Sequence, residues 1–359
     1  MGQSGWTVVR CVDLEANLRW FVDDAGFRVD LVNPADDPRR FVVSRHGVTI
    51  SLERSDVDAP AHVVIEQQAD DLTPGVIGEA PGGSTVTVQP PSDEMIMPDS
   101  VPSLTVTGGS SGGFGIGRAG MEYRDLLPDR WGGRFIASHI RIDEGGDVAD
   151  WVHFHRIRFQ MIFVAAGWVD VVYEDQGDPF RMQAGDCVLQ PPEIRHRVLR
   201  SSPGLEVIEI GCPAEHDTLA DHELELPTSI IAPDRDFGGQ RFVRHVAADA
   251  PVSPWLVGGL RWRDTGIDAA TDGEASAIVV SPDGDGQLAD AALTNAGEFA
   301  LMVGVRGTGT LAVDGHGPVE VAERASVALP PGSVWQHTAA SPDHELLVVT
   351  LPADAIRPA

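Results

Sequence analysis

Hydrophobic and polar residues alternate in short runs along most of the chain, a pattern that favours β-strands over long helices. The runs continue from about residue 120 almost to the C-terminus, separated by turns that contain Gly and Pro. One helical segment is predicted at residues 14–25, where Leu14, Leu18, Phe21 and Val22 fall on one face. The pattern therefore predicts a mainly β protein that begins with a small α+β module.

Changes in this pattern predict where one part of the chain ends and the next begins. We expect the α+β module at residues 1–92 and a linker at residues 93–119, because closely spaced Pro and Gly interrupt regular elements there. These residues are Pro90, Pro91, Pro98, Pro102, Gly108, Gly109, Gly112 and Gly113. The strand-rich region then begins near residue 120.

The strand-rich region repeats itself at an interval of 139 or 140 residues. Three short segments recur in the same order: residues 120–125 match 259–264, residues 163–167 match 303–307, and residues 189–192 match 328–331. Three matches at nearly constant spacing are difficult to obtain by chance, and they indicate a duplication. We therefore expect two tandem β-barrels of similar size, at residues 120–232 and 233–359.

Composition and charge narrow the classes of partner. A chain of 359 residues can bury a sizeable core without disulfides, and its 39 Gly and 26 Pro suit short strands joined by turns. The net charge of -28 argues against nucleic acid and against an anionic membrane surface, because binding to either requires basic residues. All 26 basic residues are Arg. A biased genome with a well-solvated surface and adaptation to high salt are both consistent with this balance.

The cysteines and the apolar runs predict the compartment. Cys11, Cys187 and Cys212 are an odd number without CxxC spacing, which argues against a disulfide framework and against a zinc ribbon. The N-terminus lacks a basic stretch followed by an apolar run, and no apolar run approaches the length of a membrane span. We therefore expect a reducing, cytoplasmic location.

A group of histidines supplies the candidate chemistry. His153 and His155 are two residues apart, so on a strand their imidazoles point to the same side. Gln160 follows shortly after, and the strand that starts beyond Gly185 leads through a Pro-Pro turn to His196. Imidazoles in this number are typical ligands of a divalent transition metal.

These residues resemble the two motifs of the cupin superfamily. In that family HxH is followed by four residues, Glu, six residues and Gly, and a second motif has Gly, five residues, Pro, one residue, Gly, two residues and His. The corresponding residues here are His153, His155, Gln160, Gly167, Gly185, Pro191, Glu193 and His196. Gln160 departs from the Glu of the pattern and Glu193 from its Gly. The resemblance implies a tandem pair of double-stranded β-helix (jelly-roll) barrels, a bicupin, whose first barrel holds one divalent metal on His153, His155, Gln160 and His196.

The exchange of Glu for Gln160 has a chemical consequence. Its amide oxygen either binds the metal directly or accepts a hydrogen bond from a metal-bound water. Three imidazoles and an amide are all neutral, so anionic oxygen or thiolate ligands should bind the metal readily. The resemblance favours Fe(II), but imidazole-rich sites also suit Ni, Cu, Zn and Mn.

Several further residues are candidates for the substrate pocket. Trp151 should share the face of His153 and His155 if the strand is regular. Arg158, Gln190 and Arg195 are close to the ligands in sequence, and an Arg can orient a carboxylate. The alternative for each Arg is an exposed place on the barrel rim. His139, on the preceding strand, is either pocket lining or a structural histidine, and Cys187 alternates with buried positions, which favours a core role.

The second barrel should lack a metal. At the repeat interval the four ligand positions become Leu293, Asn295, Ala300 and Trp335, of which only Asn295 has a metal-binding atom. We expect this barrel to be a metal-free partner that covers the hydrophobic flank of the first. In an alternative interpretation Trp335, Gln336 and His337 shape a pocket for an organic ligand.

The N-terminal module resembles the vicinal oxygen chelate group, which includes glyoxalase and bleomycin-resistance proteins. The resemblance depends on residues 12–22, 25–29 and 80–88. Residues 1–92 are few for the two βαβββ units of that fold, and no convincing ligand set is present. Arg10 and Cys11 occupy the first strand and Glu53 alone is suggestive, so a structural or dimerising role is expected.

Three functions remain open. The cupin resemblance implies a non-haem Fe(II) dioxygenase that acts on a small, oxygenated, anionic organic substrate with O2. The same architecture hosts redox-neutral isomerases, lyases and hydrolases, and a small-ligand-binding protein without turnover is a third possibility. No nucleic acid or membrane partner is expected. The chain should be a homodimer, or a monomer in which the two barrels imitate a dimer.

Overall fold

The computed structural model describes residues 5–67, 75–89, 91, 95–284 and 287–359. The chain divides into two compact units, Met1–Glu94 and Met95–Ala359. In the described residues no helix is long and apolar enough to cross a membrane.

The first unit contains two small sheets and one short helix. A four-stranded sheet has the order β1-β4-β3-β2, with β1 parallel to β4, and a three-stranded sheet has the order β5-β7-β6. The elements are β1 (Thr7–Cys11), α1 (Leu14–Arg19), β2 (Arg28–Asn33), β3 (Arg40–Arg45), β4 (Val48–Arg54), β5 (His62–Glu66), β6 (Gly75–Glu79) and β7 (Thr85–Gln89). The Asp13 side chain caps α1 by accepting from the Ala16 amide. A π-helical turn (Trp20–Asp24) continues α1 and carries the buried Phe21 into the core, as the helical pattern predicts.

The second unit begins with a barrel of two sheets. One sheet has the order β23-β17-β14-β19-β11-β10-β9, and the other has the order β16-β15-β18-β13-β20, with β12 beside β18. The strands of the first sheet are β9 (Gly115–Ile116), β10 (Glu122–Asp125), β11 (Ile136–Ile142), β14 (Phe159–Ala166), β17 (Cys187–Leu189), β19 (Leu205–Cys212) and β23 (Val243–His245). Those of the second are β12 (Gly146–Asp147), β13 (His153–His155), β15 (Trp168–Tyr173), β16 (Phe180–Gln183), β18 (His196–Ser201) and β20 (Thr218–Ala220).

A second barrel repeats this plan, as the duplication predicts. Its sheets have the orders β24-β25-β26-β33-β28-β31-β8 and β30-β29-β32-β27-β34. The strands are β8 (Thr105–Thr107), β24 (Val252–Pro254), β25 (Leu260–Asp264), β26 (Ser276–Pro282), β27 (Ala292–Asn295), β28 (Phe299–Arg306), β29 (Gly309–Val313), β30 (Gly317–Val321), β31 (Ser326–Ala328), β32 (Val334–Ala340), β33 (Glu345–Leu351) and β34 (Ile356–Pro358). A short helix, α2 (Ile267–Ala270), and a two-stranded ribbon, β21 (Asp236–Phe237) with β22 (Gln240–Arg241), complete the unit.

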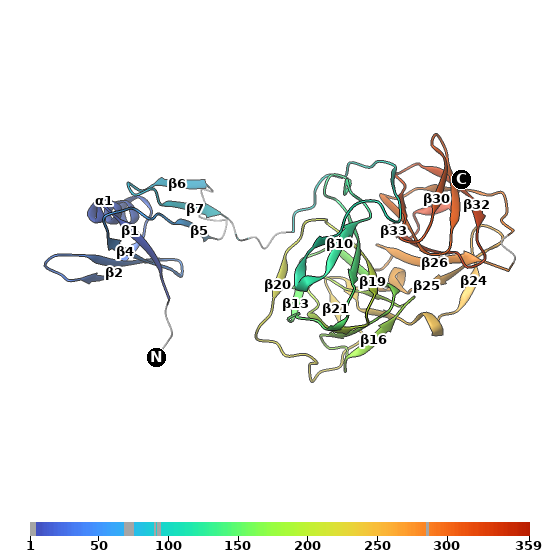
Figure 1. Cartoon of the computed structure of the whole chain (residues 1–359), viewed down its shortest axis with the longest axis horizontal. Coiled ribbons are helices and arrows are strands. Elements are labelled where there is room, and N and C mark those ends of the chain that lie inside the picture. The colour runs from blue at the N-terminus through green and yellow to red at the C-terminus, as the bar shows by residue number, and fades with distance from the viewer. Residues whose placement is uncertain (1–4, 68–74, 90, 92–94, 285–286) are drawn as a thin grey trace. The chain divides into compact units, whose positions relative to one another are not determined.

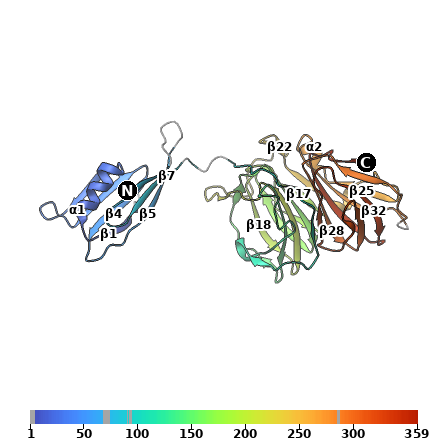
Figure 2. The ribbon, with the colours of Figure 1, turned by 90° about the horizontal axis from the view of Figure 1, so that it is seen from above.

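The two barrels pack together through a shared apolar core. On β14, Phe159, Met161 and Phe163 belong to this core, as do Leu301 and Val303 of β28. Phe135 stacks on Phe299 at a centroid separation of 4.1 Å. In Figure 2, β17 and β28 lie where the barrels meet. Because both faces of β14 and β28 are covered, these strands are almost continuously apolar instead of alternating.

Each barrel also receives a strand from outside its predicted range. β8 and β9 come from the stretch predicted as a linker, and they join the second and the first barrel respectively. Figure 1 shows the first barrel with β10, β13, β19 and β20 and the second with β25, β26, β30 and β32. β23, predicted to belong to the second barrel, pairs with β17 of the first. The exchanged strands bind the barrels to one another, so residues 95–359 form a single compact unit.

Candidate metal centre

Three histidines meet inside the first barrel. β13 and β18 pair so that His153 faces His196, and His155 lies two residues further along β13. All three are buried. Each offers one ring nitrogen such that these nitrogens lie within 4.8 Å of one another, the separation expected around one ion.

Hydrogen bonds fix the orientation of these rings. His153 Nδ1 donates to the Trp151 carbonyl at 2.8 Å, and His196 Nδ1 donates to the Ile194 carbonyl at 3.0 Å. Because a carbonyl only accepts, each ring keeps its lone pair on Nε2. The His153 Nε2 atom is buried and has no hydrogen-bond partner. His155 Nδ1 lies 3.0 Å from Thr218 Oγ1. Anchoring the far nitrogen in this way is usual for metal-ligating histidines.

The surroundings keep the imidazoles neutral, the form that binds metals. Burial lowers the pKa of His155 and of His196 well below the ordinary value, and the neighbouring histidines lower it further. Burial and the Arg118 charge also lower the pKa of His153. A protonated ring cannot bind a cation, so this environment suits a metal site.

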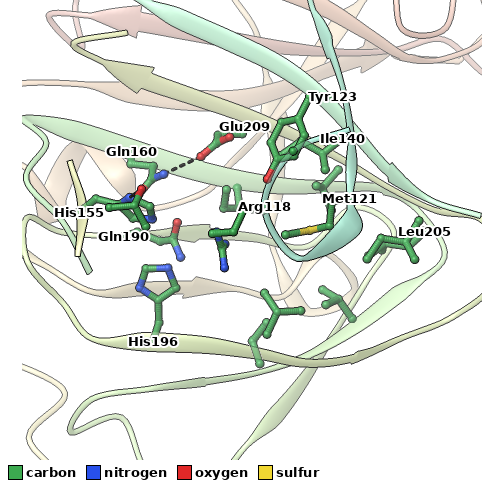
Figure 3. Close-up of a pocket in the computed structure, with 18 of the residues that line it drawn as sticks. Arg118, Met121, Tyr123, Ile140, His155, Gln160, Gln190, His196, Leu205 and Glu209 are labelled. Carbon is green, nitrogen blue, oxygen red and sulfur yellow. Dashed lines mark hydrogen bonds between the residues drawn. The ribbon is translucent and has the colours of Figure 1, made fainter. Parts of the chain in front are cut away.

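Gln160 on β14 adds a fourth donor atom. Its side-chain amide nitrogen donates to Glu209 Oε1 on β19 at 2.6 Å (Figure 3). That bond leaves Gln160 Oε1 buried without a hydrogen-bond partner. Two buried atoms without partners, Gln160 Oε1 and His153 Nε2, are atoms that a divalent ion would satisfy. The donor set therefore fits a divalent transition metal.

A cavity of about 320 Å³ opens beside these donors. Figure 3 shows His155, Gln160, Gln190 and His196 at one end and Met121, Ile140 and Leu205 at the other. The remaining wall is mostly apolar: Ile142, Ile162, Val169, Val171, Met182, Val198 and Val207. The site thus combines a polar end with an apolar interior, as ligand pockets do.

Of the five residues predicted to line the pocket, Gln190 does so, and its amide donates to the Tyr173 hydroxyl at 2.8 Å. The structure corrects the prediction for Trp151, which precedes β13 and is 42% exposed. The strand is not regular that far back, so Trp151 does not share the histidine face. Only its carbonyl oxygen takes part in the site, by accepting the hydrogen bond from His153 Nδ1.

The predictions for Arg158, Arg195 and His139 are also corrected. Arg158 pairs with Glu274 at 2.5 Å and with Glu298 at 2.8 Å, both in the second barrel. Arg195 pairs with Asp221 at 3.2 Å, on the barrel rim. His139 lies on the outer face of β11, where its Nε2 donates to Glu206 at 3.0 Å. In each case a nearby carboxylate holds the side chain away from the cavity.

Other cavity residues were not found from the sequence. Glu209, Arg118, Tyr123, His216 and Thr218 all line it. Burial raises the pKa of Tyr123 to about 12, and Glu209 adds to this effect. Glu209 had a usable signal: Leu205, Val207 and Glu209 occupy alternate positions of one apolar strand. The loop residues Arg118 and His216 carried no such pattern.

In the second barrel other residues occupy the positions that correspond to the ligands. Its strand pairing places Leu293 opposite Trp335, as His153 is placed opposite His196. Ala300 pairs with Thr350 where Gln160 pairs with Gly211. Among the described residues the three histidines of the first barrel are the only group of His, Cys, Asp or Glu that meets the geometry of a metal site. Cys187 is fully buried in the core between the barrels, as its alternation favours.

Comparisons with known proteins bear on the fold. No family model and no curated protein matches the sequence. A solved structure of a mutant Bacillus subtilis oxalate decarboxylase aligns over 76% of this chain and 82% of its own, with a TM-score of 0.52 and 11% identity. An oxalate decarboxylase formate complex from Lactobacillus farciminis aligns over 73% and 90%, with a TM-score of 0.51 and 13% identity. The protein Ylba from E. coli aligns over 73% of this chain and 96% of its own, with a TM-score of 0.50 and 10% identity.

At such low sequence identity these structural similarities show the fold alone. They confirm the predicted fold, a tandem pair of double-stranded β-helix (jelly-roll) barrels. The predicted likeness of the N-terminal module to glyoxalases is not supported by these alignments.

Proposed function

We propose that this protein is a metal-dependent enzyme whose first barrel holds one divalent transition metal on His153, His155, His196 and the amide oxygen of Gln160. The observation that carries the proposal is the set of buried, neutral imidazoles whose anchored rings leave free lone pairs beside a cavity. A structural metal site is usually closed by protein ligands, whereas a catalytic one keeps positions for substrate.

The cavity indicates the kind of substrate. Four neutral donors leave the charge of a divalent ion uncompensated, which favours a substrate that offers anionic oxygens. The apolar wall beyond the metal suits a hydrocarbon or aromatic body. We therefore infer a small organic molecule with an oxygenated, anionic head and an apolar body, which is bulkier than oxalate.

For the reaction, we propose oxidation by O2 with Fe(II), the chemistry expected from the cupin resemblance. When bound, the metal would supply electrons and a meeting point for substrate and oxygen. The chain supplies position and exclusion of water. Gln190 and Thr218 offer hydrogen bonds at the polar end, while the neutral Tyr123 phenol and the Glu209 carboxylate lie where a proton can be given or taken.

The alternative is a redox-neutral reaction, such as decarboxylation, on the same site. The likeness to oxalate decarboxylases favours it, although that likeness extends only to the fold. Mn or Zn in the native protein and activity that persists without oxygen would distinguish this alternative from oxidation.

The test begins with the metal content of the native protein. We expect about one transition metal ion per chain, and loss of the ion when His153 and His155 are both replaced by Ala. The matched control is His316→Ala, since His316 is an exposed histidine of the second barrel. If the His153→Ala/His155→Ala double variant retained the ion, the proposed site would be refuted. Oxygen uptake by the Fe(II)-loaded protein, screened over aromatic and diketone acids, then separates the two reactions.

For the N-terminal unit we propose a structural or dimerising role in a cytoplasmic protein. Its apolar core is its own, and the histidine cluster and the cavity both lie in the second unit. A change of oligomeric state on deletion of residues 1–94 would support a dimerising role.

A further inference from the structure

The second barrel contains a cavity of its own. Its volume is about 320 Å³, the same as that beside the histidines. It lies on the inner side of β25, β26 and β33, lined by Trp255, Leu256, Trp262, Asp264, Asp268, Ser276, Ile278, Val348, Thr350 and Ile356, with Pro254 and Ala353. This cavity lies outside the packed core of the barrel, to which Leu293, Ala300 and Trp335 belong.

The cavity lies beside β33, the counterpart of β19, but its described lining does not include Leu293, Asn295, Ala300 or Trp335, the buried counterparts of the metal ligands. Val348 pairs with Ile278 where Glu209 pairs with Ser138. Thr350 stands where the first barrel has Gly211, next to the counterpart of Gln160. The two cavities thus share part of their position in the barrel plan, along β19 and β33, and differ in chemistry.

The walls of the second cavity are aromatic and aliphatic. Trp255 and Trp262 are half-buried, and Trp255 packs edge-on against the buried His337 at a centroid separation of 5.4 Å. That contact holds the Trp255 ring in place. Tryptophan faces attract cations more strongly than other aromatic faces do.

The polar side chains of the cavity are two carboxylates, the hydroxyls of Ser276 and Thr350, and the indole N–H groups of the two tryptophans. Asp264 and Asp268 are exposed at the rim, where Asp264 Oδ1 accepts from the Gly266 amide at 2.9 Å, and no ion pair of either carboxylate is found among the described residues. The Thr350 hydroxyl already donates to the Ala353 carbonyl at 3.1 Å, so it offers the cavity a lone pair. No Arg or His is among the lining residues that the structure describes. An anionic ligand would find no positive partner here.

We infer that the second barrel binds a small organic cation, an ammonium group attached to an apolar body. The ammonium would lie between the two carboxylates and the tryptophan faces, and the body would pack on Ile278, Val348 and Ile356. A sugar, which also stacks on tryptophan, needs donors and acceptors around its whole ring, and this largely aliphatic wall does not supply them. The inference does not depend on the metal site or on the reaction proposed above.

The test uses the full-length protein and 2-phenylethylammonium as the probe, with 2-phenylethanol and 3-phenylpropionate as neutral and anionic analogues. Calorimetric titration should show binding of the ammonium at least tenfold tighter than that of either analogue. Indole N–H signals of Trp255 and Trp262, assigned by Trp→Phe variants, should shift on addition of the ammonium.

Two variants and a control make the result decisive. Asp264→Asn/Asp268→Asn should weaken ammonium binding at least tenfold and leave the neutral analogue unaffected, whereas Asp314→Asn, at an exposed site of the same barrel, should change neither. His153→Ala/His155→Ala should retain ammonium binding. Equal affinity for the three probes, preference for a sugar such as glucose, or no binding of any of them would overturn the inference.

Discussion

At the scale of single residues, the orientation of Gln160 depends on Glu209. The carboxylate only accepts, so it holds the amide nitrogen and turns the amide oxygen towards the histidines. We predict that Glu209→Met lowers the metal affinity about 10- to 100-fold, the usual cost of losing a partner that orients a ligand.

The control for this prediction is Glu209→Gln. Its side-chain oxygen can still accept from Gln160, so most of the affinity should remain. Competition titration with a chelator measures both variants. Equal affinity of Glu209→Met and the wild type would mean that the Gln160 amide does not bind the metal through a fixed oxygen.

Single residues also mark the limit of what the sequence predicts. The HxH spacing brought His153 and His155 to one face because strand geometry alone decides it. Closeness in sequence to a ligand does not decide where a long side chain points. Arg158 is two residues from Gln160, yet Glu274 and Glu298, more than 100 residues away, hold it. Glu209 was missed because it is far in sequence from the ligands. Its partner Gln160 lies 49 residues away on another strand.

At the scale of elements, Arg158 links the start of β14 to the second barrel. It is 27% exposed and contacts two carboxylates, of which Glu298 also pairs with Arg134 at 3.2 Å. We predict that Arg158→Met lowers the free energy of unfolding by about 1–2 kcal/mol, because Glu274 loses its cation and the two carboxylates then repel one another.

Urea denaturation followed by tryptophan fluorescence measures this change. Arg357→Met is the control, since its pair with Asp354 is largely exposed. The Arg357→Met variant should remain within about 0.5 kcal/mol of the wild type. Equal effects of the two variants would show that the link between the barrels contributes no more than a surface pair.

β19 carries a second link, which depends on pH. Glu206 accepts from His139 and from Arg324 of the second barrel, at 3.0 and 2.5 Å, and these bonds, the His139 bond foremost, lower the pKa of Glu206 from 4.5 to about 2. A carboxyl with a lowered folded-state pKa stabilises the protein above its ordinary pKa, and loses that contribution as the pH falls through the folded value.

We therefore predict that the wild type is more stable than Glu206→Gln at neutral pH, by on the order of 1 kcal/mol after solvent screening. The difference should shrink between pH 4.5 and pH 2. Denaturation curves at several pH values test this, with Glu144→Gln, an exposed site, as the control. A difference that stays constant down to pH 2 would contradict the assignment.

Elements were predicted well where their pattern is local. The strands of both barrels follow from apolar runs and turns, and the repeat anticipated their equivalence. The strands β8, β9 and β23 were missed because they are two or three residues long and become strands only by pairing with distant partners. Their Gly- and Pro-rich surroundings correctly predict turns but not what the segments between the turns contact.

At the scale of the whole molecule, the sequence predicts two barrels of which the second covers the first, but not the contacts that join them. The duplication indicated two barrels, but not that they share a core in which Phe135 stacks on Phe299. This shared core explains why strands such as β14 lack alternation. It also separates the two cavities. Each cavity lies on the opposite face of the sheet that contributes to the shared core.

The division of the chain into two units predicts that the barrels fold without the first unit. The cores of both barrels are built from residues after Met95, and the core of the first unit from residues before Glu94. A chain that begins at Met95 should therefore fold, bind about one metal ion and unfold at the same urea concentration as the barrels of the intact chain. Since each unit has its own core, the intact chain should unfold in two transitions and the shortened chain in one. Metal analysis and denaturation followed by circular dichroism test this. A shortened chain that is unfolded or free of metal would show that the first unit is needed to build the barrels.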